Sequence, residues 1–350
     1  MIALPATAWR PRRVLIIKPS SLGDVVGALP VLHGLRRTFP RAHLAWLLST
    51  ACAPLLADER DLDEIILFDR TPLGRSWRSP SAARGLLALL RALKAGRFDW
   101  VIDLQGLLRS GLFAAATGAA LRAGFGEARE GAAAFYTRRI HVSARHTVDR
   151  NIELARALGA DARPEDMTLA VGADARRFAE TICRRHRLSG GDFLVCVPPT
   201  RWPTKLYPVR HWQTVAGKLS RKAPLVLLGA PADRELCARN AKGAGPAVID
   251  LSGRTSLTQM AAVIAASAGV ICSDSAAKFI APAVGVEAIT LIGPTRIELT
   301  GPYLRGQAVV ADVPCRGCLR RRCRHVSCMQ LLDPARVVRA ATSLLDERGD

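Results

Sequence analysis

The sequence predicts an α/β protein made of two doubly wound domains, each with parallel strands and crossover helices. Short apolar runs alternate with helical patterns through the first half of the chain, and the same alternation begins again in the second half. The chain has 350 residues, which is long for one open α/β core and sufficient for two domains. We therefore expect domains at residues 1–175 and 176–350, with a cleft between them.

The first domain begins with a buried parallel strand at residues 14–17, which leads through a polar turn into a helix at about 25–39. An amphipathic helix is expected at 81–94. The apolar runs that we expect to form the further strands are 43–48, 64–68 and 98–104. The stretch from 159 to about 188 is polar and rich in arginine, and we place the junction between the domains within it.

The second domain repeats this order. Its expected strands are residues 193–197, 224–228, 247–251, 269–272 and 288–292. One expected helix begins at about residue 209, and three further helices are expected at 256–266, 276–283 and 334–345. Three of the strands end in small or polar residues. Because ligands of open α/β sheets bind outside the carboxyl ends of the strands, we expect the binding site of this domain at that edge.

The turn after the first strand, residues 18–24, carries the most chemistry in the first half. It reads KPSSLGD and combines an ammonium group at Lys18, two hydroxyl groups and a carboxylate at Asp24. Its spacing differs from both the GxGxxG dinucleotide motif and the P-loop. The free N–H groups of the following helix favour an anion. A carboxylate at a strand tip suits acid–base chemistry beside a charged ligand.

In the second half, the strand ends carry Gly229, the segment 273–276 and the segment 293–295. Ser275 and the N–H groups after it open the next expected helix, which suits a phosphate group. Each of these segments alone is also typical of an ordinary helix cap or turn. Three of them at one sheet edge, with Lys205 in the preceding loop, favour a nucleotide diphosphate site.

The chain is strongly basic, with a formal net charge of +20 from 50 Lys and Arg against 30 Asp and Glu. A basic surface suits phosphate-rich partners such as nucleic acid, anionic lipid or a nucleotide-bearing substrate. An arginine- and alanine-rich genome gives the same composition without any function. Arginine is spread through all regions, and the sequence has no basic strip interleaved with aromatic residues. We therefore expect no nucleic-acid partner.

No run approaches the roughly 18 uninterrupted apolar residues of a membrane-spanning helix. Residues 1–13 also lack the apolar core of a signal peptide. We therefore expect a cytoplasmic protein, in which cysteines stay reduced. Of the nine cysteines, five are scattered and are expected to be small buried apolar residues: Cys52, Cys183, Cys196, Cys237 and Cys272.

Five motifs follow one another along the chain. They are the turn at 18–24, the segment 102–110 with Gln105 and Arg109, the loop 199–205, Gly229-Ala230-Pro231, and Asp274-Ser275 followed by Ala281, Gly285 and 293–295. In this order they resemble glycosyltransferase family 9, the bacterial heptosyltransferases, whose first motif reads K-x-S-S-x-G-D. The resemblance extends from about residue 13 to the last helix.

The resemblance implies a GT-B fold, in which two Rossmann-like domains face a cleft and bind the acceptor on the N-terminal side and the nucleotide sugar on the C-terminal side. It implies an inverting glycosyltransferase that moves a heptose-like sugar from a nucleotide diphosphate, ADP-heptose, to a lipopolysaccharide-core acceptor. Because that acceptor is anchored in lipid, we expect peripheral contact with the inner leaflet of the cytoplasmic membrane. The alternatives are another nucleotide-sugar donor, and a non-catalytic protein that binds nucleotide or nucleic acid on the same scaffold.

The resemblance also implies roles for single residues. Asp24 matches the general base, and Lys205 matches a lysine that neutralises the donor phosphates. Ser275 and the N–H group of Ala276 match a phosphate-binding Thr-Gly pair. The other expected donor-binding residues are Thr200, Gly229, Asp274 and Lys278, and the expected acceptor-side residues are Lys18, Ser20, Ser21, Gly23, Gln105 and Arg109.

Inverting glycosyl transfer needs a base for the acceptor hydroxyl and positive charge near the departing diphosphate. A lysine and N–H dipoles supply that charge, and the sequence has no Asp-x-Asp pair at a strand end to hold a metal ion. We therefore expect a metal-independent reaction without a cofactor.

One motif departs from the family pattern. The family usually has a histidine five residues after the aspartate that Asp274 matches, and this position is Phe279. The usual glycine is Ala276. We expect Phe279 to pack in the core rather than to stack on a base, and Lys278 is a candidate replacement for the missing hydrogen-bond donor. These changes leave the nucleotide and the sugar open.

The remaining four cysteines, Cys315, Cys318, Cys323 and Cys328, cluster near the end of the chain with His325 and five arginines among them. The C-x2-C pair is a good half-site for zinc. The x4 spacings that follow are irregular for a zinc ribbon. From the sequence we favour reduced thiols or a disulfide over a structural zinc ion, with an iron–sulfur cluster third.

Overall fold

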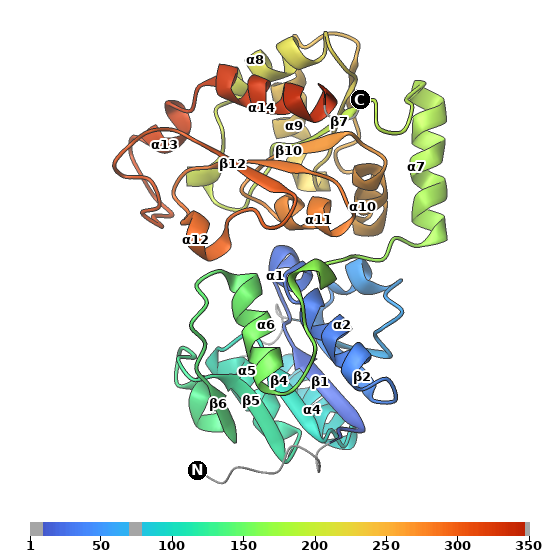
Figure 1. The fold of residues 1–350 in the computed structure, drawn as a ribbon, viewed down its shortest axis with the longest axis vertical. Helices are drawn as coiled ribbons and strands as arrows, with labels where there is room; N and C mark the ends of the chain where they lie inside the picture. The colour runs from blue at the N-terminus through green and yellow to red at the C-terminus, as the bar shows by residue number, and fades with distance from the viewer. Residues whose placement is uncertain (1–9, 70–78, 347–350) are drawn as a thin grey trace. The chain divides into compact units, whose positions relative to one another are not determined.

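The computed structural model describes residues 10–69 and 79–346, and its contacts divide the chain into two compact units (Figure 1). Unit 1 is Met1–Met167 and unit 2 is Thr168–Asp350. This division lies within the arginine-rich stretch at 159–188. The expected boundary between residues 175 and 176 lies inside α7, Ala173–His186, which is the first helix of unit 2.

Unit 1 contains a sheet of six parallel strands in the order β3-β2-β1-β4-β5-β6. The strands are β1 Arg13–Ile17, β2 His43–Ser49, β3 Glu64–Phe68, β4 Trp100–Asp103, β5 Leu121–Phe125 and β6 Arg138–Ile140. The first four confirm the apolar runs identified in the sequence. The sequence analysis missed β5 and β6, which are short and contain arginine and glycine in place of a continuous apolar run.

The helices of unit 1 are α1 Leu22–Val26, α2 Leu29–Thr38, α4 Pro80–Ala95, α5 Leu108–Ala116 and α6 Thr147–Ala157. The prediction of one continuous helix at 25–39 was wrong, because residues 22–38 form two helices, α1 and α2, separated by a short break. Pro30 lies in the first turn of α2, where its missing N–H group is tolerated. A continuous helix would need that N–H group, so the chain ends α1 and starts again.

Unit 2 has the same topology. Its six parallel strands lie in the order β12-β11-β10-β7-β8-β9. They are β7 Leu194–Val197, β8 Leu225–Leu227, β9 Val248–Asp250, β10 Gly269–Ser273, β11 Ala288–Ile292 and β12 Gly306–Val310. Counted within each unit, both sheets read 3-2-1-4-5-6, the order of a dinucleotide-binding Rossmann fold. The first five strands were predicted and β12 was not.

The helices of unit 2 are α7, α8 Val209–Leu219, α9 Arg234–Ala241, α10 Leu257–Ala265, α11 Ala277–Ala283, α12 Ile297–Thr300, α13 Ser327–Gln330 and α14 Pro334–Asp346. The helices expected near 209, 256, 276 and 334 are all present. Ser256 caps α10 by accepting a hydrogen bond from the Gln259 N–H group. Among the helices of residues 10–69 and 79–346, none has both the length and the apolar character needed to cross a bilayer.

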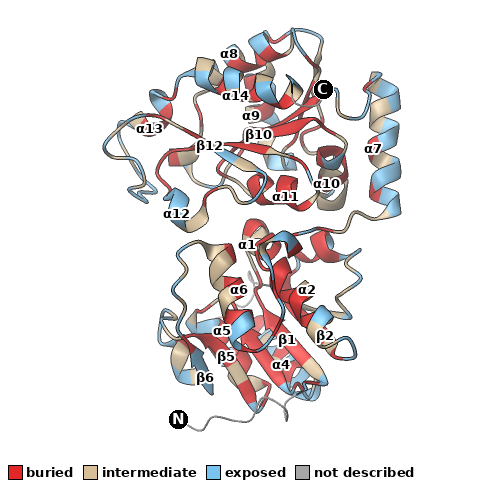
Figure 2. Ribbon diagram, in the orientation of Figure 1, coloured by how far each residue is buried: buried red, intermediate tan, exposed pale blue. Residues whose placement is uncertain are grey.

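Each unit has its own core. The strands are largely buried in both sheets, whereas α7 is mostly exposed (Figure 2). Parallel strands covered by helices on both faces need apolar side chains on both sides, which explains the continuous Val, Leu and Ile runs. In each sheet the first strand lies beside the fourth: Ile17 pairs with Asp103, and Val197 pairs with Cys272. The loops at this edge of each sheet therefore leave from neighbouring points.

Candidate active site

In unit 1, the turn after β1 and the loop after β4 are joined by a buried lysine. Lys18 is 7% exposed, and its Nζ atom donates a hydrogen bond to the carbonyl oxygen of Leu104 at 2.7 Å. Burial lowers the pKa of Lys18, although the nearby carboxylates of Asp24 and Asp103 oppose the shift. The lysine thus fixes the two loops against each other and brings positive charge to the edge of the sheet.

Asp24 lies in α1 and is held by the residue that precedes this helix. Ser21 donates two hydrogen bonds to Asp24 Oδ2, from its backbone N–H at 2.9 Å and from its Oγ at 2.6 Å. These bonds fix the orientation of the carboxylate. Within the described residues no hydrogen bond reaches the second oxygen, Oδ1, so that atom is able to accept a hydrogen bond from a ligand.

Asp24 and Lys18 line a cavity of about 290 Å³ in unit 1. The same cavity is lined by Glu127, Arg129 and Arg150, so three cations face two carboxylates. Arg150 forms an ion pair with Glu127, and its guanidinium carbon lies 4.9 Å from the centroid of the Phe125 ring. The cavity is therefore polar and carries an excess of positive charge, which suits a hydroxylated ligand with anionic groups.

Gln105 also lines this cavity, as the sequence analysis expected of an acceptor-side residue. Its Oε1 atom is buried, and no hydrogen bond reaches that atom from the described residues. A buried carbonyl oxygen without a partner is unfavourable, and a ligand hydroxyl group would satisfy it.

The loop that carries Gln105 is organised by a buried aspartate at the end of β4. Asp103 Oδ1 accepts hydrogen bonds from the backbone N–H groups of Gln105 at 2.8 Å and Gly106 at 3.1 Å. Tyr136 donates to Oδ2 at 2.6 Å. Burial raises the pKa of Asp103, although these hydrogen bonds oppose the shift, and burial beside this carboxyl group also raises the pKa of Tyr136.

In unit 2, the centre of the site is a second buried aspartate, Asp274, which follows β10 directly. Its Oδ2 atom lies 2.8 Å from Nζ of Lys205 and accepts a hydrogen bond from Thr295 Oγ1 at 2.5 Å. Lys278 forms an ion pair with Oδ1. Thr200 donates to the carbonyl oxygen of the same residue at 2.8 Å. Three segments that are far apart in the sequence, residues 200–205, 274–278 and Thr295, therefore meet at Asp274.

The two lysines share one carboxylate, which leaves an excess positive charge. Burial alone would raise the pKa of Asp274, but Lys278 and Lys205 outweigh it and hold the pKa below its usual value. For Lys205, burial lowers the pKa despite the attraction of Asp274, and repulsion from Lys278 adds to the shift. The two shifts differ in their main cause, which is the neighbouring lysines for Asp274 and burial for Lys205, but in both cases two cations face one anion. An anionic ligand would supply the missing charge.

The other expected donor-side residues lie around this cluster. Ser275 Oγ is buried and receives no hydrogen bond from the described residues. Ala276 is the residue that precedes α11. Gly229, at the end of β8, is closely packed, because a Cβ atom there would lie 3.1 Å from Cys237 Sγ. Phe279 belongs to α11 and is buried, with 5% exposure. Lys278 Nζ lies 5.0 Å from the centroid of the Phe279 ring.

Not every expected acceptor-side residue lines the cavity in unit 1. Ser20 and Ser21 are partly exposed in the turn, and Gly23 is buried in α1. Arg109 is exposed in α5, and its guanidinium carbon lies 5.9 Å from the centroid of the Phe68 ring. The structure thus brings together Lys18, Asp24 and Gln105, and it places Arg109 on the surface.

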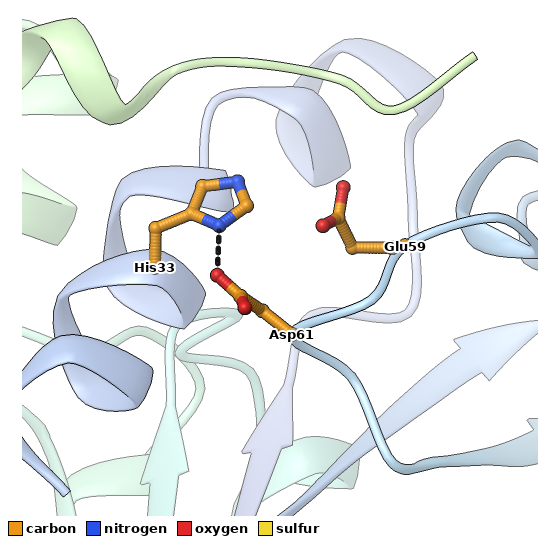
Figure 3. A group of neighbouring side chains, drawn as sticks. All are labelled: His33, Glu59 and Asp61. Atoms are coloured by element: carbon orange, nitrogen blue, oxygen red, sulfur yellow. Dashed lines mark hydrogen bonds and ion pairs between the residues drawn. The ribbon is translucent and has the colours of Figure 1, made fainter. Parts of the chain in front are cut away.

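A further cluster in unit 1 has the geometry of a metal site. His33 Nδ1 lies 2.7 Å from Asp61 Oδ2, with Glu59 nearby on the loop before β3 (Figure 3). In the part of the chain that the structure describes, this is the only group of three such residues with one ligand atom each within 4.8 Å of the others. His33 and Asp61 already form a partly buried hydrogen-bonded pair, so we assign no ion to the cluster.

The sequence analysis missed several residues of both sites: Glu127, Arg129, Tyr136, Arg150 and Asn151 in unit 1, and Trp202 in unit 2. Asn151 is buried in α6, and its Nδ2 atom donates to the carbonyl oxygen of Gly27 at 3.0 Å. The five residues of unit 1 belong to segments with no local motif, and they reach the site only through the pairing order of the strands. Trp202 lies in the loop 199–205, which the sequence analysis identified as a motif without naming Trp202 as a site residue.

Comparisons with known proteins agree with this arrangement. The sequence model of glycosyltransferase family 9 (heptosyltransferase) matches residues 86–328. Lipopolysaccharide heptosyltransferase 1 of Pseudomonas aeruginosa is 32% identical over 331 residues, which cover 89% of this chain and 88% of the relative. The enzyme of the same name from Escherichia coli K12 is 29% identical and covers 85% of this chain and 92% of its own length.

Solved structures give the same result for the fold. A glycosyltransferase family 9 protein from Veillonella parvula superposes with a TM-score of 0.81 at 21% identity, covering 96% of this chain and 97% of its own. The heptosyltransferase WaaC of E. coli, solved with ADP, has a TM-score of 0.77 at 26% identity and covers 95% of this chain and 99% of its own. The two Rossmann-like units are therefore those of a GT-B enzyme. The motifs, the topology and the relatives lead to one conclusion: this chain is a glycosyltransferase and belongs to glycosyltransferase family 9, the heptosyltransferase family.

Proposed function

We propose that this enzyme transfers a heptose from ADP-heptose to a lipopolysaccharide-core acceptor, with inversion at the anomeric carbon. The single observation that carries the proposal is Asp24, a carboxylate oriented by Ser21 at the wall of a cationic cavity in unit 1. The names of the relatives support the substrates, since the P. aeruginosa and E. coli proteins are lipopolysaccharide heptosyltransferases. WaaC has also been solved with ADP-2-deoxy-2-fluoro heptose, at 25% identity and a TM-score of 0.75.

In this proposal, unit 1 binds the acceptor. Asp24 accepts the proton of the acceptor hydroxyl group at Oδ1, which makes the oxygen a better nucleophile. The Oε1 atom of Gln105 accepts a hydrogen bond from a second hydroxyl group, which orients the sugar. Arg129 and Arg150 balance anionic groups of the acceptor. Attack by the acceptor oxygen from the face opposite the diphosphate inverts the anomeric carbon.

Unit 2 binds the donor. When the bond to the sugar breaks, the departing diphosphate gains negative charge, and cations already in place stabilise it without reorganisation. Lys205 and Lys278 exceed the charge of Asp274, which favours an anion beside them. Asp274 then acts as a positioning residue that holds the two lysines, and Ser275 Oγ supplies a hydrogen bond to the phosphate. This arrangement needs no catalytic metal ion and no cofactor.

The acceptor is anchored in lipid, so the enzyme works at the cytoplasmic face of the membrane and makes only peripheral contact with it. The formal charge of +20 supports attraction to an anionic surface. Liposome sedimentation at low and high salt tests this part separately. Binding to anionic vesicles that salt does not weaken would contradict an electrostatic contact.

The test of the reaction uses purified full-length enzyme, ADP-heptose and the heptose-free core acceptor. NMR of the product should report the opposite anomeric configuration to the donor. The rate should change by less than about twofold when Mg²⁺ is added, because no metal ion stabilises the leaving group. Retention of configuration, or a strict need for added Mg²⁺, would contradict the mechanism.

The choice of donor is tested by thermal shift with ADP, UDP, GDP and CDP, because Phe279 and Ala276 depart from the family pattern. ADP should stabilise the protein most. Preference for another nucleotide would favour a different sugar donor. Tight binding of duplex DNA without any nucleotide effect would favour the non-catalytic alternative.

A further inference from the structure

The second cavity of interest lies in unit 2, at the cysteine cluster, whose segment stands between β12 and α14 in the sequence. It has a volume of about 160 Å³ and is lined by Cys315, Cys318, Cys323 and Cys328, together with His325. All nine cysteines lie in the described residues and are free thiols there. The disulfide that the sequence left open is therefore not formed. Despite the irregular x4 spacings, Cys323 and Cys328 line the same cavity as the C-x2-C pair.

The backbone around the cysteines has the form that thiolate ligands need. Gly317, inside the C-x2-C pair, has a φ of +73°, a conformation that glycine adopts without strain. Val326 has a φ of +41°, which is unfavourable for a β-branched residue. In this conformation its N–H group donates to Cys323 Sγ at 3.4 Å. Such a hydrogen bond stabilises a thiolate, and strain of this kind is typical of functional positions.

The charges around the cavity also favour thiolates. Five arginines lie among the cysteines: Arg316, Arg320, Arg321, Arg322 and Arg324. Neighbouring cations lower the cost of ionising a thiol. Four thiolates in one cavity would repel one another without a cation among them. A dication removes that repulsion, and the arginines balance the negative charge of a tetrathiolate complex.

We propose that the four cysteines of this cavity bind one zinc ion as thiolates. On binding, each thiol gives its proton to solvent and forms a Zn–S bond, with no change of oxidation state. In the described residues no three of these sulfur atoms lie within 4.8 Å of one another. Metal binding therefore requires the sulfur atoms to move closer together. The shared cavity is the reason to prefer zinc over the reduced thiols or disulfide that the sequence favoured.

The site is linked to the loop that carries Lys205. Thr204 Oγ1 donates to the carbonyl oxygen of Arg320 at 2.9 Å. The guanidinium carbon of Arg321 lies 4.7 Å from the centroid of the Trp202 ring, and Lys205 Nζ lies 4.3 Å from the same centroid. The N–H group of Leu319 donates to the Pro294 carbonyl oxygen at 2.6 Å, beside Thr295. Zinc would therefore fix the cationic loop around the donor, a consequence that rests on the proposed function.

The direct test is metal analysis of the full chain, purified under reducing conditions without a polyhistidine tag. Mass spectrometry of the elements should find about one zinc ion per chain. Cys318→Ser, which removes an exposed ligand, should lower the zinc content at least about tenfold. Cys183→Ser, at a free cysteine of α7 outside the cluster, should keep it. Less than about a tenth of an equivalent of zinc, even after refolding with zinc, would overturn the proposal, and iron in place of zinc would overturn the assignment of the ion.

A second measurement keeps the test decisive where Cys318→Ser fails to fold. Co²⁺ exchanged into the wild-type protein should give the intense absorption of tetrahedral cobalt thiolates, and alkylation of the four cysteines should be slower with metal than without it. Cobalt spectra without thiolate bands would overturn the ligand set.

The link to the donor is tested with ADP as the probe. Metal-free protein should bind ADP more weakly than zinc-loaded protein and should melt at a lower temperature. Equal ADP affinity in the two forms would overturn the link while leaving the zinc site. If neither form binds ADP, the proposed function fails, and the zinc content still tests the site by itself.

Discussion

Asp103 and Asp274 lie at the same edge of the sheets of the two units: Asp103 is the last residue of the fourth strand, β4, and Asp274 directly follows the fourth strand of unit 2, β10. Both are buried, with exposures of 0% and 4%. Asp103 is bound by backbone N–H groups and the hydroxyl group of Tyr136, and its pKa is raised. Asp274 is bound by two lysines and Thr295, and its pKa is lowered.

The difference teaches that the topology sets where a carboxylate lies, and that its neighbours set what it can do. In unit 1, Asp103 accepts hydrogen bonds from neutral donors and shapes the loop of Gln105. In unit 2, Asp274 holds two lysines at the edge of the sheet. The same edge thus carries a carboxylate that organises a loop in one unit and a carboxylate that gathers cations in the other.

The largest expected effect separates the roles of the two units. Asp24→Asn keeps the shape of the side chain and removes its basicity, so turnover should fall roughly 100- to 10,000-fold. ADP affinity, measured by calorimetry, should stay the same, because the proposed function assigns that binding to unit 2. Asp58→Asn, at an exposed carboxylate of unit 1, is the control. A variant at Asp24 that keeps more than about a tenth of the activity would remove this residue from the role of base.

The next effect compares the buried carboxylates through stability. Asp274→Asn leaves two lysines without their anion, which should lower the free energy of unfolding by about 3–5 kcal/mol. Tyr136→Phe removes one hydrogen bond to Asp103 and should lower it by about 1.5–3 kcal/mol. Urea unfolding followed by circular dichroism measures both. A greater loss of unfolding free energy for Tyr136→Phe than for Asp274→Asn would show that the ion pairs of Asp274 stabilise the protein less than the neutral hydrogen bonds of Asp103.

A third prediction concerns donor binding alone. Lys205→Ala should weaken ADP binding by about 1.5–3 kcal/mol, the range for a charge-assisted contact. Acceptor binding should change much less, because the acceptor is assigned to unit 1. Lys218→Ala, on the exposed face of α8, is the matched control. Equal losses for the donor and the acceptor would identify Lys205 as a structural lysine.

The smallest effect is a pH dependence of opposite sign in the two units. The pKa of Asp274 is lowered, so its stabilisation is full above its usual value of 3.8 and is lost as the pH falls through the folded-state pKa. The pKa of Asp103 is raised, so its stabilisation is full below 3.8 and is lost as the pH rises through the folded-state pKa.

Two variants measure this contrast. Below about pH 4, the stability of the wild type relative to Asp274→Asn should rise with pH and then level off. Its stability relative to Asp103→Asn should be level below about pH 4 and should fall as the pH rises above that value. Unfolding by urea at several pH values gives both curves. Two curves with the same slope would mean that the neighbours do not set the charge of these carboxylates.

The sequence predicted most of the fold because buried parallel strands consist of continuous apolar runs, such as LVCV in β7 and AITLI in β11. It missed β6, RRI, and β12, GQAVV, because edge strands have less apolar surface to bury. The break between α1 and α2 was also missed, although Pro30 was its signal.

The candidate sites were predicted where motifs carry them and missed where only packing does. Lys18, Asp24 and Lys205 stand in recognisable loops. Tyr136 and Arg150 lie in segments without a motif, and they reach the site through the order of the strands. No local sequence pattern predicts the order in which the strands pair. The predicted cleft between the two domains stays a prediction.

The contacts between the Lys205 loop and the last part of the chain bear on how the protein is made. Thr204 bonds to Arg320 across 116 residues, and the hydroxyl group of Tyr207 bonds to the carbonyl oxygen of Leu332 across 125 residues. Unit 1 is complete once residue 167 has left the ribosome, so it can fold while synthesis continues. The loop of Lys205 emerges early but finds its partners only when the chain is almost finished. A nascent chain that stops before residue 320 would therefore have an ordered first unit and no finished donor site.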